Sequence, residues 1–493
     1  MRQSSSASPP APGDIPRFSI GAEMRENLLL LAGMMLFLVY GAFRQRFIWG
    51  VDSFGYFEFG KLLSEGRVFL PLDIPSRAAE ALVPWGFRLN ALQQAVPEYP
   101  PGYPLLLSIG HLLRAPTWVN PVCGVVSCAL LFGLLQRRAS TGTALLLTAG
   151  WAVMPLTVYG STMLMSDLVA ATALMGGLLA FQTGRPALSA WILGFAITVR
   201  PTNVLFLLPF VLLLDADRKT LRFLLHLSAP CLLYAAYNTW LFGAPWRTGY
   251  GNVSTVLTSD VFPRFLPFFA ATTWTLLTPI IVLFAAAALL RPNRERVFLV
   301  LWALGLAVFY SFWSGGGTDR WWWARFLLPA YPAIFLLAGD GAEAAKGWLA
   351  RRFGGGRWPA LCVLAALLAV PALNLKFGLA QNDLWQRTTG EPNRQLVGAI
   401  EGAIPPGSLV GSLEHASSLK LYTKLIPFVC VHPKAPELVD ETLARGLKVY
   451  LLPEPWQMDQ PVVRELFRRF EAREVARYHS PWPDLRLFEL HRR

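Results

Sequence analysis

The polar residues that could carry chemistry are few, and they stand at the ends of apolar runs. Asp52 follows the first apolar run, in WGVDSFGYFEFGKLLSEGRVF, and Asp167 stands between two later runs, in TMLMSDLVAA. Arg200 interrupts a long apolar stretch, in TVRPTN. A carboxylate can take a proton from a hydroxyl group, and the planar donor fork of arginine suits phosphate. These residue types indicate proton transfer beside a bound anion.

Each of these residues also has a simpler interpretation. Asp52 and Asp167 could each cap the start of a helix by accepting backbone N–H bonds. Arg200 could form an internal ion pair with Asp167. A charged side chain at the edge of an apolar run is costly unless it serves a site, so we favour function for Asp52 and an anion site at Arg200. Both interpretations of Asp167 stay open, because it could equally be a second carboxylate that faces Asp52.

A further candidate region is EYPPGYPLLLSIGHLL, residues 98–113, in which an acid and three prolines precede a short apolar helix. Pro104 can start this helix, and the following Ala–Pro pair ends it after about ten residues, or roughly 15 Å. Such a helix cannot cross about 30 Å of hydrocarbon, so it must be interfacial or re-entrant. It could close a pocket near Glu98, with Tyr103 as a further substrate contact, or it could be only a rigid linker.

The last candidate region is SGGGTDRWWWARFLLPAYP, residues 314–332, in which Arg320 and Arg325 bracket three tryptophans. Tryptophan is enriched where a membrane meets water, so the three rings predict an interfacial belt. The two arginines are better candidates for contacts with a phosphate group.

The stretch that begins at Asp52 has helical spacing. Asp52 and Tyr56 share one face with apolar residues, whereas Glu58, Lys61 and Glu65 lie on the opposite face. This pattern predicts an amphipathic helix at the membrane surface. Tyr56 would then lie one turn after Asp52, as a substrate contact.

The composition places these residues in a membrane protein. Of the 493 residues, 54% are hydrophobic and 15% are charged, whereas a soluble domain has about 25% charged residues. The net charge of +13 is concentrated in short loops between apolar runs, which indicates orientation in a bilayer rather than nucleic-acid binding. The five cysteines show no disulfide framework and no metal-ligand spacing.

The apolar runs predict the membrane-spanning segments. Basic loops between them lie on one side if the N-terminus is cytoplasmic, and the unusual polar residues then gather on the outer side. The run at 187–214 is broken at Arg200 by the following proline, so we expect two short arms there. The runs are 26–44, 118–136, 141–159, 163–182, 187–214, 221–243, 266–290, 296–313, 325–342 and 357–376.

We therefore expect an α-helical polytopic membrane protein with about 10–12 transmembrane or re-entrant helices and a small C-terminal α/β domain outside the membrane. Residues 1–25 are Ser/Pro-rich and predicted to be a disordered cytoplasmic N-terminus. Residues 26–376 form the membrane domain, with the first external loop at 45–117. In residues 378–493, short β-rich runs alternate with helical ones, and nothing in this tail looks catalytic.

The ordered set of motifs resembles the GT-C superfamily of integral-membrane glycosyltransferases, near the bacterial protein-mannosyltransferase and aminoarabinose-transferase types. The set comprises an external acid in D-x-x-x-Y, YPPGYPLLL, STMLMSDLVAATALMGGLLAF, GFAITVRPTNVLFLLPFVLLL and RFLLPAYPAIFLLAG. The resemblance covers roughly residues 26–376. It implies a polyprenyl-phosphate-linked sugar donor, inversion at the anomeric carbon, and a carboxylate at the position of Asp52. It also matches Asp167 and Arg200 to family positions.

The sequence departs from the family at Ser53, where many relatives have a second acid. This places a metal-dependent version in doubt, and the activated phosphate leaving group requires no cofactor. The resemblance implies transfer to an acceptor hydroxyl on a glycan, a lipid or a protein at the outer face, with Asp52 as the general base. The composition suggests a bacterial inner membrane. A transporter or flippase of lipid-linked sugars, or a non-catalytic scaffold, is the alternative.

Overall fold

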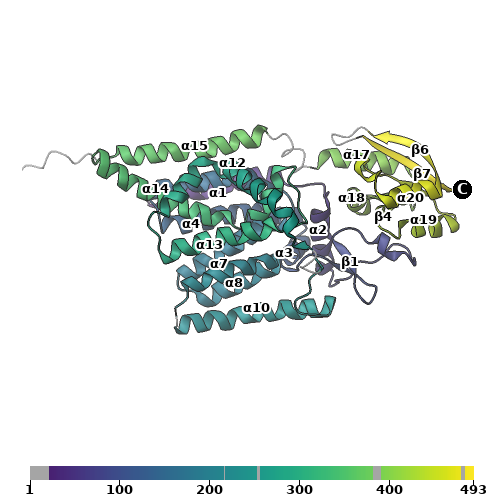
Figure 1. Ribbon diagram of the computed structural model, residues 1–493, viewed down its shortest axis with the longest axis horizontal. Coiled ribbons are helices and arrows are strands. Elements are labelled where there is room, and N and C mark those ends of the chain that lie inside the picture. Colours follow the sequence, from purple (N-terminus) through teal and green to yellow (C-terminus); the bar gives the residue numbers. More distant parts are fainter. Residues whose placement is uncertain (1–21, 216, 252–255, 381–389, 479–483) are drawn as a thin grey trace, which may run out of the picture.

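The computed structural model describes residues 22–215, 217–251, 256–380, 390–478 and 484–493. The segment predicted to be disordered, residues 1–25, lies almost wholly outside the described residues. The described chain forms a helical body at one end of the molecule and a smaller unit with a β-sheet at the other (Figure 1).

The long helices of the body coincide with the predicted apolar runs. A bilayer offers no hydrogen-bond partners to the backbone, so an apolar run satisfies its own N–H and C=O groups as a helix. The helices are α1 (Ala22–Ala42), α4 (Val119–Gln136), α5 (Thr141–Val153), α6 (Pro155–Thr162), α7 (Ser166–Gln182), α8 (Pro186–Val199), α9 (Val204–Phe210), α10 (Arg218–Phe242), α12 (Phe262–Ala288), α13 (Arg294–Ser311), α14 (Tyr331–Phe353) and α15 (Trp358–Ala380).

Within the described residues, three helical stretches are long and apolar enough to cross a membrane: Pro116–Gln136, Ser259–Ala288 and Trp358–Ala380. The bent pair formed by α5 and α6 makes a fourth if it counts as one span. Shorter apolar helices, among them α7 and α8, pack with these spans in the same body. The chain is thus a helical membrane protein with a small C-terminal sheet unit, as its composition predicts.

Breaks interrupt several of the helical runs. Arg200 ends α8 in an extended conformation (φ −144°, ψ 115°), and the 3-10 turn η3 (Pro201–Asn203) leads into α9. The break predicted at Arg200 is therefore confirmed. A second break, which we did not predict, bends α5 against α6 by 59°, because Pro155 cannot continue the hydrogen-bond ladder of α5.

The first loop after α1 contains two helices that pack against each other, α2 (Val51–Ser64) and α3 (Gly102–Leu112). The loop between them holds η1 (Ala79–Leu82) and an antiparallel pair of short strands, β1 (Phe87–Leu89) and β2 (Ala95–Pro97). A Cβ at Gly102 would lie 2.5 Å from Thr198 Oγ1 and 2.6 Å from the backbone of that residue. Gly102 therefore allows α3 to dock on the end of α8, directly before Arg200.

The polar face predicted for α2 does not lie free at a membrane surface. Lys61 and Glu65 are exposed, but Glu58 is buried. The C-terminal unit is the reason, because its helix α18 (Ala416–Tyr422) packs against α2. The prediction that Glu58 lies on an exposed polar face of α2 is therefore wrong.

The C-terminal unit is built on a five-stranded sheet in the order β4-β3-β5-β7-β6. The first three strands are parallel, and β7 and β6 are antiparallel additions. This alternation of strands and helices agrees with the small α/β unit expected from the sequence. The elements are α17 (Glu391–Ala403), β3 (Leu409–Ser412), β4 (Ile426–Val429), α19 (Ala435–Ala444), β5 (Val449–Leu451), η7 (Pro455–Gln457), α20 (Pro461–Arg469), β6 (Phe470–Tyr478) and β7 (Leu485–Arg492).

The first loop and the C-terminal unit share an interface. Ala81 and Leu82 of η1 belong to a hydrophobic cluster that also contains residues of the sheet. The Ser76 hydroxyl donates to Glu441 Oε2 at 2.8 Å, and the Ile48 backbone N–H donates to the Tyr422 hydroxyl at 2.7 Å. The unit therefore lies against the loop that carries Asp52, which brings its side chains within reach of any site there.

The basic loops meet at the end of the body that is remote from the C-terminal unit (Figure 1). Asp340 accepts from Arg138 and from Arg296, each at 3.1 Å. Arg138 also donates to Glu295 at 2.6 Å. Two of the loops that the sequence assigns to one side of the membrane, those of Arg138 and Arg296, therefore come together in space.

Candidate active site

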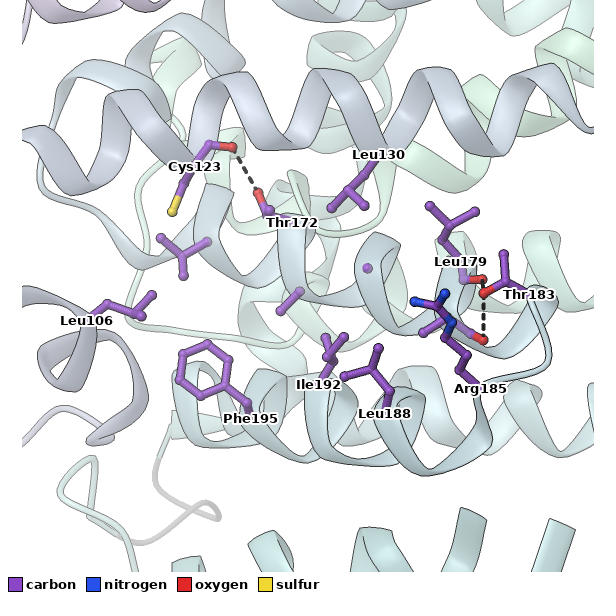
Figure 2. Close-up of a pocket in the computed structure, with 14 residues that line it drawn as sticks. Leu106, Cys123, Leu130, Thr172, Leu179, Thr183, Arg185, Leu188, Ile192 and Phe195 are labelled. Atoms are coloured by element: carbon purple, nitrogen blue, oxygen red, sulfur yellow. Dashed lines mark hydrogen bonds between the residues drawn. The ribbon is translucent and has the colours of Figure 1, made fainter. Parts of the chain in front are cut away.

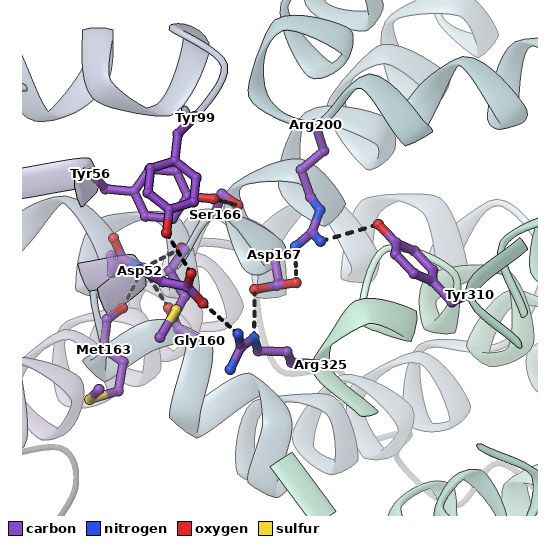
Figure 3. Close-up of polar contacts among 12 residues, drawn as sticks. Asp52, Tyr56, Tyr99, Gly160, Met163, Ser166, Asp167, Arg200, Tyr310 and Arg325 are labelled. Atoms are coloured by element: carbon purple, nitrogen blue, oxygen red, sulfur yellow. Dashed lines mark hydrogen bonds and ion pairs between the residues drawn. The ribbon is translucent and has the colours of Figure 1, made fainter. Parts of the chain in front are cut away.

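A cavity of about 840 Å³ lies where the helical body, the first loop and the C-terminal unit meet. Six of the eight residues proposed from the sequence line it: Asp52, Tyr56, Glu98, Asp167, Arg200 and Arg325. They come from elements that are far apart in the chain, and most of them form one connected set of polar contacts (Figure 3).

Asp52 lies in the first turn of α2 and points into this cavity. The N-cap of α2 is Gly50, at φ 79°, and no side chain caps the helix, so Asp52 is not the cap that the simpler interpretation required. Its Oδ1 accepts a hydrogen bond from the Tyr99 hydroxyl at 2.7 Å, and its Oδ2 accepts from Arg325 at 2.5 Å. One third of the side chain is exposed, so a ligand can reach the carboxylate.

Asp167 lies in the first turn of α7, and its side chain is only 3% exposed. It pairs with Arg200 and lies 3.8 Å from the Nε of Arg325. The structure therefore brings Asp167 and Asp52 to the same arginine, as expected if both aspartates belong to one site. The internal pair between Arg200 and Asp167, which was the simpler interpretation of Arg200, forms as well.

Arg200 is held by the break between α8 and α9 and by two hydroxyl groups. It donates to the Tyr310 hydroxyl at 3.1 Å, and that hydroxyl lies 2.9 Å from Thr202 Oγ1. Its guanidinium carbon lies 5.3 Å from the ring centre of Phe326. The break in the helix is what frees this side chain to reach across to α7 and α13.

Arg325 is buried and connects the two aspartates. Its guanidinium carbon lies 5.4 Å and 5.2 Å from the ring centres of Trp322 and Trp323. Both of these rings line the cavity. Two of the three tryptophans predicted to form an interfacial belt therefore contribute to the site, because the turn η6 (Trp321–Leu327) folds them over Arg325.

Tyr56 and Glu98 complete the wall beside Asp52. The Tyr56 hydroxyl lies 2.9 Å from Ser166 Oγ, and its ring packs on Tyr99 at 4.3 Å. Burial raises the pKa of Tyr56 well above its usual value, so this phenol stays protonated. Burial also raises the pKa of Glu98 to about 7, although the nearby Arg88 lowers it.

Two residues proposed from the sequence do not line the cavity. Tyr103 is fully buried and donates to Asn120 Oδ1 at 2.6 Å. Asn120 in turn donates to three backbone carbonyls, those of residues 160, 163 and 165, which shape the turn before α7. Arg320 is exposed and lies 3.8 Å from Asp319. Tyr103 thus supports the position of Asp167, and Arg320 lies outside the site.

Several cavity residues were missed from the sequence. Tyr99 directly follows Glu98 in the candidate segment 98–113, so its position beside Glu98 could have identified it. Tyr310 lies at the end of an apolar run and carried no such signal. A whole wall of the cavity comes from the C-terminal unit, in whose sequence nothing looked catalytic: Asn393, Glu414, His415, Glu454, Trp456 and Leu485.

The two aspartates of the site are both paired with arginine. Each of them already faces a guanidinium group, Asp52 that of Arg325 and Asp167 that of Arg200. Within the described part of the chain, no three His, Cys, Asp or Glu side chains are grouped as metal ligands. Ser53, the residue after Asp52, is buried and does not line the cavity.

A second hollow of about 540 Å³ lies between α3, α4, α7 and α8 (Figure 2). Its lining is mostly aliphatic, with Leu106 and Phe195 toward α3 and Leu179 and Leu188 toward the opposite end. Arg185 is the one charged residue among those that line it. The hollow carries no group for proton transfer, and its shape and apolar lining suit a hydrocarbon chain.

Comparison with known proteins identifies the fold. No family model and no curated protein matches the sequence. ArnT from Cupriavidus metallidurans, solved bound to undecaprenyl phosphate, matches with a TM-score of 0.60 and 15% identity over 95% of this chain and 98% of that chain.

Two larger proteins match less closely. The oligosaccharyltransferase AglB from Archaeoglobus fulgidus, solved with an inhibitory peptide and a dolichol-phosphate, matches at a TM-score of 0.56 and 12% identity, over 88% of this chain and 70% of that one. The arabinofuranosyltransferase AftD from Mycobacteria matches with a TM-score of 0.51 and 13% identity, over 94% of this chain and 40% of that chain. All three are glycosyltransferases of the GT-C superfamily. The resemblance seen in the sequence is therefore confirmed at the level of the fold.

Proposed function

We propose that the protein is a membrane glycosyltransferase that moves a sugar from a polyprenyl-phosphate-linked donor to an acceptor hydroxyl group. One observation carries the proposal: a reachable carboxylate, Asp52, and two arginines, Arg200 and Arg325, line the same cavity. Base and phosphate ligands are what this transfer requires. The shared fold adds support, because two of the similar structures were solved with a polyprenyl phosphate bound.

In the proposed reaction, the acceptor oxygen attacks the anomeric carbon of the donor sugar from the face opposite the phosphate. The bond between that carbon and the phosphate oxygen breaks, and the electron pair stays on the phosphate. Asp52 takes the proton of the attacking hydroxyl group. One displacement from the opposite face inverts the anomeric carbon.

The burial of the two aspartates separates their roles. Asp52 is one third exposed and can contact the acceptor, whereas Asp167 is 3% exposed and already holds Arg200. We therefore assign proton transfer to Asp52 and positioning of the arginines to Asp167. The arginines stabilise the charge that develops on the leaving phosphate, in a site from which much of the water is excluded.

The apolar hollow beside α7 and α8 offers a place for the donor tail. Its lining includes Val169, close in sequence to Asp167, and Phe195, shortly before Arg200. A phosphate held at Arg200 would therefore place its isoprenoid chain near the end of this hollow that Phe195 lines. Burial of each CH₂ group there contributes about 0.8 kcal/mol, which suits a long apolar carrier.

Orientation follows from the same proposal. The basic loops would lie in the cytoplasm, as positively charged loops do, and the cavity with the C-terminal unit would lie outside. The N-terminus would then be cytoplasmic, and the host membrane a bacterial inner membrane. Cysteine labelling in intact cells, at one cysteine introduced in a basic loop and one introduced in the C-terminal unit, would test this arrangement.

The deciding experiment is donor turnover. The protein, purified with its native lipids, is incubated with a panel of polyprenyl-phosphate sugars and crude membrane acceptors, and released polyprenyl phosphate is measured by mass spectrometry. We expect release from one donor by the wild type, and a loss of about 10²- to 10⁴-fold in Asp52→Asn, the range for loss of a general base.

The matched control is Asp260→Asn, an exposed aspartate that does not line the cavity. It should release product at the wild-type rate. If Asp52→Asn were fully active, the assignment of the base would be wrong. If no donor were turned over, while proteoliposomes moved a lipid-linked sugar across the bilayer, the protein would be a carrier instead.

A further inference from the structure

The C-terminal unit presents a wall of polar residues to the cavity, and the proposed reaction uses none of them. Glu414 and His415 follow β3, and Glu454 and Trp456 follow β5. Because β3 and β5 are parallel neighbours, both loops lie at the same edge of the sheet, beyond the carboxyl ends of the strands.

This edge is a topological switch point. After β3 the chain passes through α18 to β4 on one side, whereas after β5 it passes through α20 toward β6 and β7 on the other side. The loops therefore leave two adjacent strands in opposite directions and open a crevice between them. In open α/β sheets, ligands bind in such crevices.

Two polar side chains on this wall are mostly buried and form no side-chain hydrogen bond within the described part of the chain. Asn393 is 4% exposed and His415 is 7% exposed, and both line the cavity. Neither side chain forms a hydrogen bond with another described residue; the nearest contact of the imidazole, Nε2 to Glu454 Oε1, measures 4.0 Å. Both residues line the cavity, so their free donor and acceptor atoms are available to a polar ligand there.

Trp456 adds an apolar surface beside these polar groups. Its indole N–H donates to Glu454 Oε2 at 2.6 Å, which fixes the ring, while half of the side chain stays exposed. A fixed indole face next to carboxyl, imidazole and amide groups matches a sugar ring, which has a face of C–H groups and an edge of hydroxyl groups.

The charges on this wall disfavour an anionic ligand. Burial lowers the pKa of His415 to about 4, so its imidazole is neutral at pH 7. Burial and the neighbouring Glu414 raise the pKa of Glu454 to about 7. No lysine or arginine of the described part of the C-terminal unit lines the cavity. A phosphate therefore belongs at Arg200 and Arg325, and a neutral polyhydroxyl group belongs here.

We propose that Asn393, His415, Glu454 and Trp456 form an acceptor subsite that binds a saccharide unit of the acceptor. This inference rests on the proposed function and names its acceptor class. The saccharide stacks on Trp456, and its hydroxyl groups exchange hydrogen bonds with Asn393, His415 and Glu454. One of its hydroxyl groups then faces the first-loop wall, where Asp52 takes the proton.

The test measures saccharide binding without turnover, on the full-length protein in nanodiscs. Saturation-transfer NMR is recorded with the methyl pyranosides of glucose, galactose, mannose and N-acetylglucosamine. We expect at least one to bind, and Trp456→Ala to weaken that binding by at least about tenfold. His415→Ala and Asn393→Ala should weaken it as well. Trp348→Ala, which alters a similarly exposed tryptophan that does not line the cavity, should bind as the wild type does.

A second arm separates the two sources of such a saccharide. The sugar that binds best is presented again on a diacylglycerol embedded in the nanodisc. Tighter binding of the lipid form would assign the acceptor to membrane glycolipids, and equal binding would assign it to a soluble glycan chain. If no sugar binds in either form, or if Trp456→Ala and His415→Ala bind normally, the subsite proposal is refuted.

A parallel measurement keeps the two proposals apart. Native mass spectrometry follows the binding of undecaprenyl phosphate, which should be lost in Arg200→Ala and retained in Trp456→Ala. Retained phosphate binding and donor turnover together with absent sugar binding would overturn only the acceptor subsite. Loss of both donor binding and turnover in the wild type would overturn the proposed function itself.

Discussion

Replacing Arg325 by methionine should destabilise the folded protein, because it removes the cation that two carboxylates share. Arg325 lies 2.5 Å from Asp52 and 3.8 Å from Asp167. Together with Arg200, these residues form a set of two negative and two positive charges, and the substitution leaves it with a net charge of −1. Methionine keeps much of the apolar stem, so the loss of charge dominates.

The size of the effect follows from burial. Unit charges 4 Å apart attract by about 4 kcal/mol at an effective dielectric constant of 20, and removal of one partner of a buried pair typically costs about 3–5 kcal/mol. Asp52 is one third exposed and regains water, whereas Asp167 is 3% exposed but keeps Arg200. We therefore expect Arg325→Met to lower the free energy of unfolding by about 3 kcal/mol, the lower end of that range.

The assay is thermal unfolding in nanodiscs, followed by intrinsic fluorescence. Each kcal/mol shifts Tm by about 2–4 °C in domains of 150–250 residues and by less in longer chains. Arg325→Met should therefore lower Tm by roughly 5 °C. Arg320→Met, five residues earlier and exposed, should leave Tm within about 1 °C of the wild type, because surface pairs contribute little.

A double variant makes the reasoning refutable. Asp52→Asn in the Arg325→Met background restores a net charge of zero and leaves the pair of Asp167 and Arg200 intact. The free energy of unfolding lost in the double variant should therefore be smaller, by about 1 kcal/mol or more, than the sum of the losses in the two single variants. Additive losses, or a single Arg325→Met variant as stable as the wild type, would show that the shared-cation argument is wrong.

Three further predictions concern the first loop. Tyr99→Phe removes the 2.7 Å hydrogen bond to the carboxylate of Asp52, a charged hydrogen bond that contributes about 1.5–3 kcal/mol. Donor turnover should therefore fall at least tenfold, while undecaprenyl phosphate still binds. Unchanged turnover would contradict this. For Glu98, the pKa of about 7 in the folded protein exceeds the unfolded value, so the wild type loses stability relative to Glu98→Gln as pH rises from 5 to 7, and a Tm difference that stays constant over this range would argue against the shift. Gly102→Ala places a Cβ 2.5 Å from Thr198 Oγ1 and should lower stability by about 1–3 kcal/mol, measured as Tm; a variant as stable as the wild type would show that α3 does not need this close approach.

Much of the helical body could be predicted from the sequence. The apolar runs anticipate α1, α4, α7, α8, α10 and α12 to α15 because a bilayer leaves an apolar chain no other way to satisfy its backbone. Pro201 marks the break at Arg200 for an equally local reason. The same signal was present at Pro155, where the bend between α5 and α6 was not expected.

The type and rough position of the candidate site were also readable from the sequence. Charged residues are rare in apolar runs, so Asp52, Asp167 and Arg200 stood out one at a time. Their simpler interpretations could not be rejected, however, because the sequence alone does not say which charge faces which. The pair of Arg200 and Asp167 spans 33 positions, and that of Arg325 and Asp52 spans 273.

By itself, then, the sequence determined the membrane helices, their main break and the alternating strands and helices of the C-terminal unit. Each of these depends on periodicity, backbone chemistry or burial within a short stretch. Only the tertiary structure decided that Tyr99 and Arg325 hold Asp52, that Tyr103 and Arg320 stand apart, and that His415 and Trp456 face the cavity. Asp52 is 47 positions from Tyr99 and 273 from Arg325, so these contacts exist only because the helices and the sheet pack in one particular way.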